Sequence, residues 1–379
     1  MKISRFKVEE WLNPLDDKAK HNLGSSCCKP VTLEGLLTLT NTDEVAFFKE
    51  IKEMSLHYGY FFGMPRLKKA IANLYTDAVN PEMVLCVHGG TGANSIVCYT
   101  LCEEGDNIVS ILPNYQQYYS IPEALGVEVR ICTCNEDTNY AIDFEKIRAM
   151  VNENTKMINL ANPNNPTGYT LTKVELEELA DIARSVDAYV VCDEIYRGLS
   201  DEYMYSICDI YEKGICTSST SKVFSSAGTR VGWIVTRDLG IKDALMSYRS
   251  YNSICEGEFN ELVAAIVLEN KDIFYRRNKT IVEEGRAALN EWLKTQPHFR
   301  VACDSMSSTS FLYYDFDMPA EEFAQRLYDE KSTLVCHGAC FEQEHSFRIG
   351  YGFGDIEYFK DGLKQIGNFV KELEEKGEI

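Results

Sequence analysis

The chain has 379 residues, of which 45% are hydrophobic, and its 58 acidic against 38 basic side chains give a formal net charge of -20. This length and apolar content predict a globular, enzyme-sized protein with two domains. The negative charge disfavours nucleic acid and anionic lipid as partners, because both would be repelled over most of the surface.

The N-terminal segment is charged throughout and lacks the apolar run of a secretory signal peptide, and no later stretch has the apolar length of a membrane span. We therefore expect a cytoplasmic protein without membrane contacts. The 14 cysteines lie mostly within apolar runs, which indicates reduced thiols in the core rather than disulfides. No histidine or second cysteine pair completes a zinc-binding pattern, so we predict no metal site.

Residues 81–236 alternate short runs rich in β-branched residues with helical patterns, which is typical of βα units around a mostly parallel sheet. Residues 174–186 are predicted to be helical, because apolar residues recur at a spacing of three and four and Thr172 with Glu175 forms a capping-box pattern. Seven strands are predicted, at residues 83–87, 107–112, 127–132, 156–161, 188–193, 214–219 and 232–236.

After residue 236 the pattern changes to long amphipathic helical stretches at 260–295, 319–330 and 356–377, with a strand at 310–317. The N-terminal segment is expected to pack beside the last of these helices. The sequence thus predicts an α/β protein in which a large domain has a mostly parallel seven-stranded sheet flanked by helices, and a smaller α+β domain is built from both termini. The expected bounds are 46–262 for the large domain, and 1–45 with 263–379 for the small one.

Three motifs lie at or just after predicted strands. Asn162 to Gly168 reads NPNNPTG, Asp193 to Tyr196 reads DEIY, and Lys222 lies in SSTSKVFSSAGTR, with Arg230 eight positions further on. Each motif alone also fits an ordinary turn, a helix cap or a solvated lysine. Because ligands of parallel sheets bind at the carboxyl ends of the strands, the shared position of the motifs favours a single site.

The order and spacing of these motifs resemble the class I/II aminotransferases, which are pyridoxal 5'-phosphate (PLP) enzymes of fold type I, the aspartate aminotransferase fold. The resemblance covers most of the chain, through HYGYFFG near residue 58, GGTGA near 90, PNYQQY near 115 and SFRIGYG near 348. It implies a PLP-binding large domain and an enzyme of amino acid metabolism that moves an amino group between an amino acid and a 2-keto acid. It also implies a homodimer with shared active sites.

The resemblance assigns a role to each matching residue. Lys222 is implied to hold the cofactor as a Schiff base and later to move a proton, and Asp193 to pair with the protonated pyridine nitrogen. Tyr196 and Asn165 are implied to bind the ring's phenolic oxygen, and Tyr115 to stack on the ring. Lys222, Asp193 and Tyr196 are the implied catalytic residues. We expect burial beside the cationic ring to lower the pKa of Lys222 towards neutrality.

The phosphate group is implied to bind Ser219, Arg230 and the backbone amides of Gly90 and Thr91, where a helix N-terminus favours an anion. Tyr58 resembles the tyrosine that reaches the phosphate of the neighbouring subunit.

Arg348 is implied to bind the substrate carboxylate through two parallel N–H donors, with Asn165 and Gly24 also on the substrate side. Dicarboxylate-specific relatives carry a second arginine near residues 253–256, where this chain has SICE, so the resemblance does not favour aspartate or glutamate.

Two alternatives within PLP chemistry remain. A short likeness around Gly24 to the capreomycidine-synthase-like branch leaves open an enzyme that acts on an arginine derivative, and Glu256 is compatible with a cationic substrate. A β-elimination lyase of the same fold, similar to cystathionine β-lyase, is also open. A noncatalytic relative or the effector domain of a transcription regulator is disfavoured, the former because Lys222, Asp193, Arg230 and Arg348 are all retained.

Overall fold

The computed structural model describes residues 2–304, 307–352 and 354–379. Its central sheet has seven strands in the order β2-β8-β7-β6-β5-β3-β4. The five strands β3 to β7 are all parallel to one another, and β8 is antiparallel to both β2 and β7. All seven predicted strands are confirmed to within one residue at either end: β2 (Val84–His88), β3 (Asn107–Leu112), β4 (Glu128–Thr133), β5 (Thr155–Ala161), β6 (Tyr189–Asp193), β7 (Gly214–Ser219) and β8 (Val231–Thr236).

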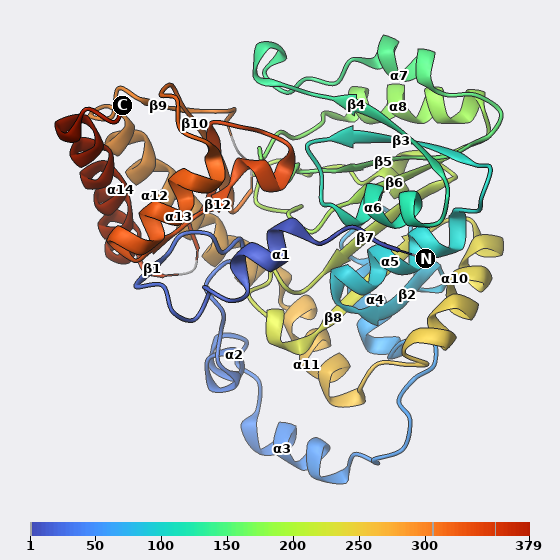
Figure 1. Cartoon of the computed structure of the whole chain (residues 1–379). Coiled ribbons are helices and arrows are strands. Elements are labelled where there is room, and N and C mark those ends of the chain that lie inside the picture. Colours follow the sequence, from blue (N-terminus) through green and yellow to red (C-terminus); the bar gives the residue numbers. More distant parts are fainter. Residues whose placement is uncertain (1, 305–306, 353) are drawn as a thin grey trace.

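Helices cover both faces of this sheet, with α7 and α8 on one side and α5, α6 and α10 on the other (Figure 1). Successive side chains of β6 point to opposite faces, so Val190 belongs to the core cluster that contains Leu179 of α8, and Val191 to the cluster that contains Ile96 of α5. The helices around the sheet are α4 (Pro65–Ala72), α5 (Gly89–Leu101), α6 (Gln117–Ala124), α7 (Phe144–Met150), α8 (Lys173–Ser185), α9 (Ile207–Ile210), α10 (Leu239–Asn252) and α11 (Glu258–Glu269).

The predicted capping box of α8 is confirmed. The Glu175 backbone N–H donates to Thr172 Oγ1 at 3.3 Å, and the Thr172 N–H donates to Glu175 Oε2 at 2.7 Å. The predicted helical stretch 260–295 is confirmed, and it is divided at Asn270 into α11 and α12 (Lys271–Leu293). Asn270 Nδ2 donates to the Ile266 carbonyl at 2.8 Å, and such a side-chain bond competes with the helical backbone pattern.

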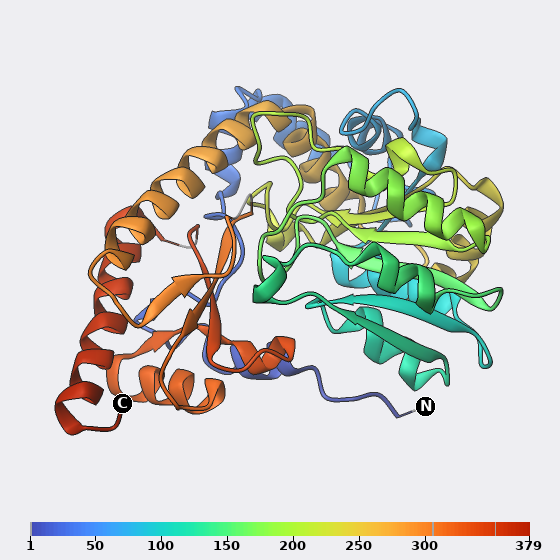
Figure 2. The ribbon, with the colours of Figure 1, turned by 90° about the horizontal axis from the view of Figure 1, so that it is seen from above.

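A second, antiparallel sheet has the order β12-β13-β10-β9 and packs with the long helices that follow the central sheet in sequence (Figure 2). The predicted strand 310–317 is confirmed as β10, and the helices predicted at 319–330 and 356–377 are confirmed as α13 and α14. The elements of this region are β9 (Phe299–Val301), β10 (Thr309–Tyr314), α13 (Ala320–Lys331), β11 (Thr333–Leu334), β12 (Cys336–His337), β13 (Ser346–Gly350) and α14 (Ile356–Lys376).

The N-terminal segment packs beside α14, as predicted. Strand β1 (His21–Asn22) pairs in parallel with β11, and His21 Nε2 lies 2.8 Å from Asp361 Oδ2 of α14. Before β1, helix α1 (Lys7–Leu12) lies between the second sheet and the central sheet (Figure 1). Trp11 Nε1 donates to the Val335 carbonyl at 2.8 Å on one side of α1. Helices α2 (Leu33–Leu39) and α3 (Glu44–Glu53) then extend away from the body of the molecule.

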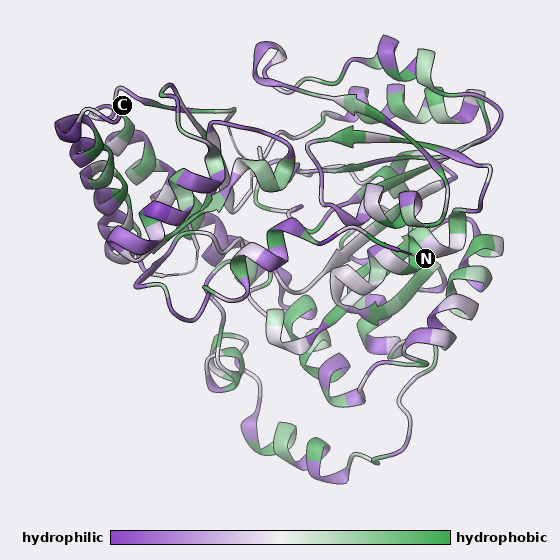
Figure 3. Cartoon of the chain, viewed as in Figure 1, coloured by the Kyte–Doolittle hydropathy of each residue, from purple (hydrophilic) through white to green (hydrophobic). Residues whose placement is uncertain are grey.

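Hydropathy follows this layering, with hydrophobic residues along β2 and β8 and alternating hydrophobic and hydrophilic stretches along α14 (Figure 3). Twelve of the 14 cysteines are buried, which confirms their predicted place in the core, and Cys27 and Cys255 are partly exposed. Within the described residues, no helix combines the length and the apolar character needed to cross a membrane.

Gly232 of β8 allows the start of α5 to approach the sheet. A Cβ atom at this position would lie 2.4 Å from the backbone carbon of Gly89 and 2.8 Å from the backbone nitrogen of Gly90. We expect Gly232→Ala to lower the free energy of unfolding by about 1–3 kcal/mol, because only backbone movement relieves the overlap. Urea unfolding measures this, with Gly228→Ala as the control, since a Cβ on Gly228 meets nothing within 4 Å. Equal unfolding midpoints for the two variants would contradict the close approach.

Candidate active site

A cavity of about 410 Å³ lies at the carboxyl ends of the parallel strands, where α1 and β13 close over the central sheet. Its walls come from four places: α1 with the loop after β1, the start of α5, the segments that follow β3, β5, β6 and β7, and β13. Nine of the residues predicted for the site line this cavity: Gly90, Thr91, Tyr115, Asn165, Asp193, Tyr196, Lys222, Arg230 and Arg348.

The parallel sheet brings the three motifs together. In the register of the sheet, Ala161 at the end of β5 pairs with Asp193 at the end of β6, and Asp193 pairs with Thr217 of β7. The NPNNPTG segment therefore starts beside Asp193, and the turn that carries Lys222 starts beside it on the other side. Residues far apart in sequence meet because parallel strands end at the same edge.

Asp193 is buried, with 6% of its surface exposed. Its Oδ2 accepts from Asn94 Nδ2 at 3.0 Å, and its Oδ1 accepts from the Ile195 N–H at 3.1 Å. Asn94 is held in turn by Tyr118, whose hydroxyl donates to Asn94 Oδ1 at 2.8 Å. Burial raises the pKa of Asp193 to about 6, although both hydrogen bonds act to lower it. Among the described residues no cationic group lies within ion-pair distance of this carboxylate, so it can accept a cationic ligand.

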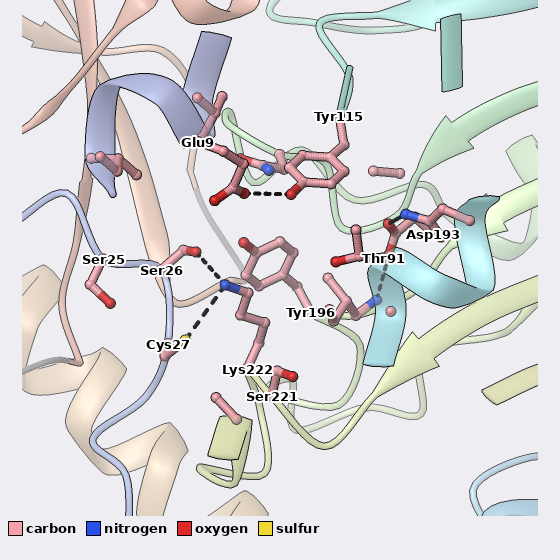
Figure 4. Close-up of a pocket in the computed structure, with 18 of the residues that line it drawn as sticks. Glu9, Ser25, Ser26, Cys27, Thr91, Tyr115, Asp193, Tyr196, Ser221 and Lys222 are labelled. Carbon is pink, nitrogen blue, oxygen red and sulfur yellow. Dashed lines mark hydrogen bonds between the residues drawn. The ribbon is translucent and has the colours of Figure 1, made fainter. Parts of the chain in front are cut away.

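Lys222 follows β7, and its amine points into the cavity (Figure 4). Lys222 Nζ donates to Ser26 Oγ at 2.9 Å and lies 3.5 Å from Cys27 Sγ. Burial acts to lower the pKa of Lys222, but its interactions with Cys27 and Tyr196 act to raise it and the net direction is upward. The predicted lowering of this pKa applies to the lysine beside a cationic ring and stays a prediction.

The opposite end of the cavity is suited to an anion. Helix α5 begins at Gly89, so the unpaired N–H groups of its first turn, which contains Gly90 and Thr91, lie at the cavity wall. Arg230 and Ser221 also line the cavity, and the Arg230 guanidinium lies against Gly89 at the start of α5. Together these groups supply the charge and the donors that a phosphate dianion requires.

Tyr115 stands at the side of the cavity after β3. Its hydroxyl donates to Glu9 Oε1 of α1 at 2.6 Å (Figure 4). Burial, followed by the charge of Glu9, raises the pKa of Tyr115 well above its usual value, so the hydroxyl remains a hydrogen-bond donor. This bond joins α1 to the wall of the central sheet.

Arg348 of β13 reaches the cavity from the second sheet and is 2% exposed. Its Nη1 donates to Asn165 Oδ1 and its Nη2 to the Gly24 carbonyl, both at 2.9 Å. Its Nε is buried without a hydrogen-bond partner. Among the described residues no carboxylate pairs with this guanidinium, so its charge is available to an anionic ligand.

Three predicted site residues do not line the cavity. Ser219 is buried beneath it and accepts the Ser221 N–H at 3.1 Å, so it shapes the turn before Lys222. Gly24 contributes its carbonyl to Arg348, as described above. Tyr58 is 61% exposed, away from the cavity wall. Glu256, considered for a cationic substrate, instead contacts His88 and Ser253, both at 3.3 Å.

Other residues of the site were not predicted to line it. Glu9 and Asp16 come from the part of the N-terminal segment that precedes the likeness around Gly24. Ser26 lies within that likeness, but its contact with Lys222, like that of Cys27, follows only from the fold. Asn94 could have been found, because it lies four residues after Gly90 and therefore on the same face of α5.

These features fit pyridoxal phosphate. The buried Asp193 lacks a cation that a protonated pyridine nitrogen would supply, the first turn of α5 with Arg230 lacks an anion, and the Lys222 amine lies in the same cavity. Such a set of groups on a mostly parallel seven-stranded sheet defines a PLP enzyme of fold type I.

Comparison with known proteins agrees. A family model described as Aminotransferase class I and II matches residues 37–366. The crystal structure of a PLP-dependent aminotransferase from Streptococcus suis 89-1591 is similar, with a TM-score of 0.94 and 38% identity, covering 98% of this chain and 99% of that one. An aspartate aminotransferase of Streptomyces avermitilis is 28% identical over 344 residues, 83% of this chain and 81% of the relative. Capreomycidine synthase of Streptomyces vinaceus is 23% identical over 349 residues, 91% of this chain and 88% of the relative.

The chain belongs to the class I and II aminotransferase family. It is a PLP-dependent aminotransferase with the aspartate aminotransferase fold, as the motifs predicted.

The raised pKa of Asp193 predicts that the free energy of unfolding of the cofactor-free protein depends on pH. The folded value of about 6 lies above the unfolded value of about 4, so the folded state binds a proton more tightly. Stability is therefore lost as the pH rises from about 4 to 6, and the loss is complete above pH 6. We expect Asp193→Asn to raise the free energy of unfolding by about 3 kcal/mol at pH 8 and by little at pH 4.

Urea unfolding of the cofactor-free protein at several pH values measures this effect. Asp187→Asn, on an exposed carboxylate, is the control. If Asp193→Asn raised the free energy of unfolding equally at pH 4 and pH 8, the ionised carboxylate of Asp193 would not be the cause of the lost stability.

Proposed function

We propose that the reaction takes place in the cavity between the two sheets, with Lys222 as the proton-transferring base. The observation that supports this most directly is the placement of Lys222, Asp193 and Arg348 around one cavity, each without an oppositely charged side-chain partner among the described residues. The large domain at 46–262 would supply Lys222 and Asp193, and the small domain at 1–45 and 263–379 would supply Arg348.

Bound PLP supplies an aldehyde carbon that joins covalently to an amine and a pyridine ring that accepts electron density from the amino acid. In our proposal Asp193 keeps a proton on the pyridine nitrogen. Asn94 and the Ile195 N–H hold the carboxylate in place for this. Tyr196 and Asn165 bind the phenolic oxygen, and Tyr115 lies against the ring.

Lys222 Nζ would take the proton from the substrate Cα. Ser26 Oγ, 2.9 Å from this nitrogen, holds the amine at the cavity wall when it is not bound to the cofactor. Arg348 would bind the substrate carboxylate, which fixes the Cα–H bond relative to Lys222. Gly90, Thr91, Ser221 and Arg230 would bind the phosphate, with Ser219 supporting the Ser221 turn.

We further propose a cytoplasmic homodimer that acts in amino acid metabolism. Exposed apolar side chains support the dimer, because residues 56–62 include five of them and lie against the segment around residue 256: Leu56, Tyr58, Tyr60, Phe61 and Phe62. Tyr58 then contributes to the phosphate site of the partner rather than to its own.

Lys222→Ala is expected to reduce the rate of keto acid formation by at least about 1000-fold, because the base that moves the Cα proton is lost. Mass spectrometry after borohydride treatment should show the cofactor adduct on Lys222 in the wild type and none in the variant. Lys213→Ala is the control, since Lys213 pairs with Asp187 on the surface. Turnover by the variant within tenfold of the wild type would disprove this role of Lys222.

A mixture of subunits tests the shared site. Lys222→Ala and Tyr58→Ala each damage a different part of a shared site, so a hybrid dimer of the two variants contains one intact site and one with both defects. When the subunits are refolded together, activity should return to about a quarter of the wild-type value, because half of the dimers are hybrids with one working site each. No gain over the separate variants would place Tyr58 in its own subunit's site or outside any site.

A further inference from the structure

The proposed function gives a role to every cationic side chain that lines the cavity of this subunit. Among the described residues that line it, the basic side chains are Lys222, Arg230 and Arg348. Lys222 would react, Arg230 would bind the phosphate, and Arg348 would bind the substrate carboxylate. No cation of this subunit remains for a second carboxylate, so the residues that line its cavity do not favour a dicarboxylic amino acid.

The wall formed by the N-terminal segment is acidic. Glu9 and Asp16 line the cavity together with Val8, Leu12 and Asn13, which recur at helical spacing. The Asn13 N–H donates to the Glu9 carbonyl at 3.0 Å and the Asp16 N–H to the Leu12 carbonyl at 2.9 Å, so the helical backbone pattern continues past the end of α1. Both carboxylates therefore lie on one face of the segment, the face that meets the cavity.

Neither carboxylate is neutralised. Glu9 Oε1 accepts from the Tyr115 hydroxyl at 2.6 Å, and Asp16 Oδ1 accepts from Asn22 Nδ2 at 2.8 Å. In the part of the chain that the structure describes, no lysine, arginine or histidine lies within 4 Å of either. The adjacent Glu10 differs, because it faces away from the cavity and pairs with Arg5 at 2.6 Å.

A second and independent observation shows that a ligand of mixed charge fits here. Arg348 is buried, lines the same cavity and has an Nε without a partner, which leaves a charged donor free for the carboxylate of a ligand. Glu9 and Lys222 face the same space beside Tyr196 (Figure 4). A molecule with its carboxylate on Arg348 and its amine near Lys222 would therefore extend a side chain into a space bordered by two acids.

We propose that Glu9 and Asp16 form the side-chain subsite of this enzyme and bind the terminal cation of a basic amino acid, of the class of ornithine, lysine or arginine. This inference rests on the proposed function, which fixes the position of the substrate carboxylate and amine. It replaces Glu256, which lies outside the cavity, as the basis for a cationic substrate.

Binding of unreactive ligands tests the subsite without turnover. The ligands are 6-aminohexanoate, hexanoate and hexanedioate, which carry an ammonium, no charge or a carboxylate at the far end and lack an α-amino group. They are titrated calorimetrically into holoenzyme whose cofactor has been fixed to Lys222 with borohydride. We expect 6-aminohexanoate to bind at least roughly tenfold more tightly than hexanoate, the size of one charged hydrogen bond, and hexanedioate to bind most weakly.

The double variant Glu9→Gln/Asp16→Asn should remove this preference, because no charged contact to the ammonium remains. The affinities for 6-aminohexanoate and hexanoate should then agree within roughly twofold. The matched control is Glu10→Gln/Asp17→Asn, which removes the same charge from neighbouring positions that do not line the cavity and should keep the full preference. Equal binding of the three ligands to the wild type, tighter binding of hexanedioate, or an equal loss in the control would overturn the proposal.

A separate measurement distinguishes failure of the subsite from failure of the proposed function. Unreduced holoenzyme is mixed with ornithine, lysine, arginine, alanine or aspartate, and loss of the visible cofactor band is followed. If neutral or acidic amino acids react and basic ones do not, the subsite is wrong and aminotransfer stands. If no amino acid reacts while the ligand preference persists, the subsite stands and the proposed function fails.

Discussion

The structure of the site depends on one unfavourable interaction, the burial of the Asp193 carboxylate without a cation beside it. Two hydrogen bonds, from Asn94 and from the Ile195 N–H, compensate only part of the lost hydration, since the pKa of Asp193 remains raised. A carboxylate in this state is stabilised strongly by a cationic ring. In our proposal the protein gives up stability when empty and recovers it when the cofactor binds, which is the usual relation between a pre-organised site and its ligand.

Much of the central sheet, and the meeting of the motif residues at one cavity, was predictable because the relevant signals are local. Each of the motifs that contain Asp193 and Lys222 adjoins a strand with a clear apolar pattern, and parallel strands place such motifs at one edge. The break at Asn270 was missed because the apolar periodicity continues through it, while the side-chain bond that interrupts the helix leaves no trace in that pattern.

The substrate side of the cavity was less predictable. Glu9 and Tyr115 are separated by more than a hundred residues and meet only because α1 packs against both sheets. The pattern of α1 is that of an ordinary amphipathic helix with surface acids, so nothing in it separates Glu9, which enters the cavity, from Glu10, which does not. The contact between Lys222 and Cys27 was missed for a related reason, because Cys27 comes from the same N-terminal segment.

The two sides of the cavity are built on different parts of the fold, which affects how substrate specificity can change. The groups toward the cofactor are fixed on the central sheet, where a displacement of Asp193 or Lys222 would disturb the buried hydrogen bonds beneath them. The groups toward the substrate side chain lie on a short helical segment held by a few contacts, among them those of Trp11 and Tyr115. Charge on that segment can change without altering the core of the sheet. Substrate preference can therefore vary among proteins of this fold while the cofactor chemistry stays constant, and a relative's substrate is a poor guide to the substrate of this chain.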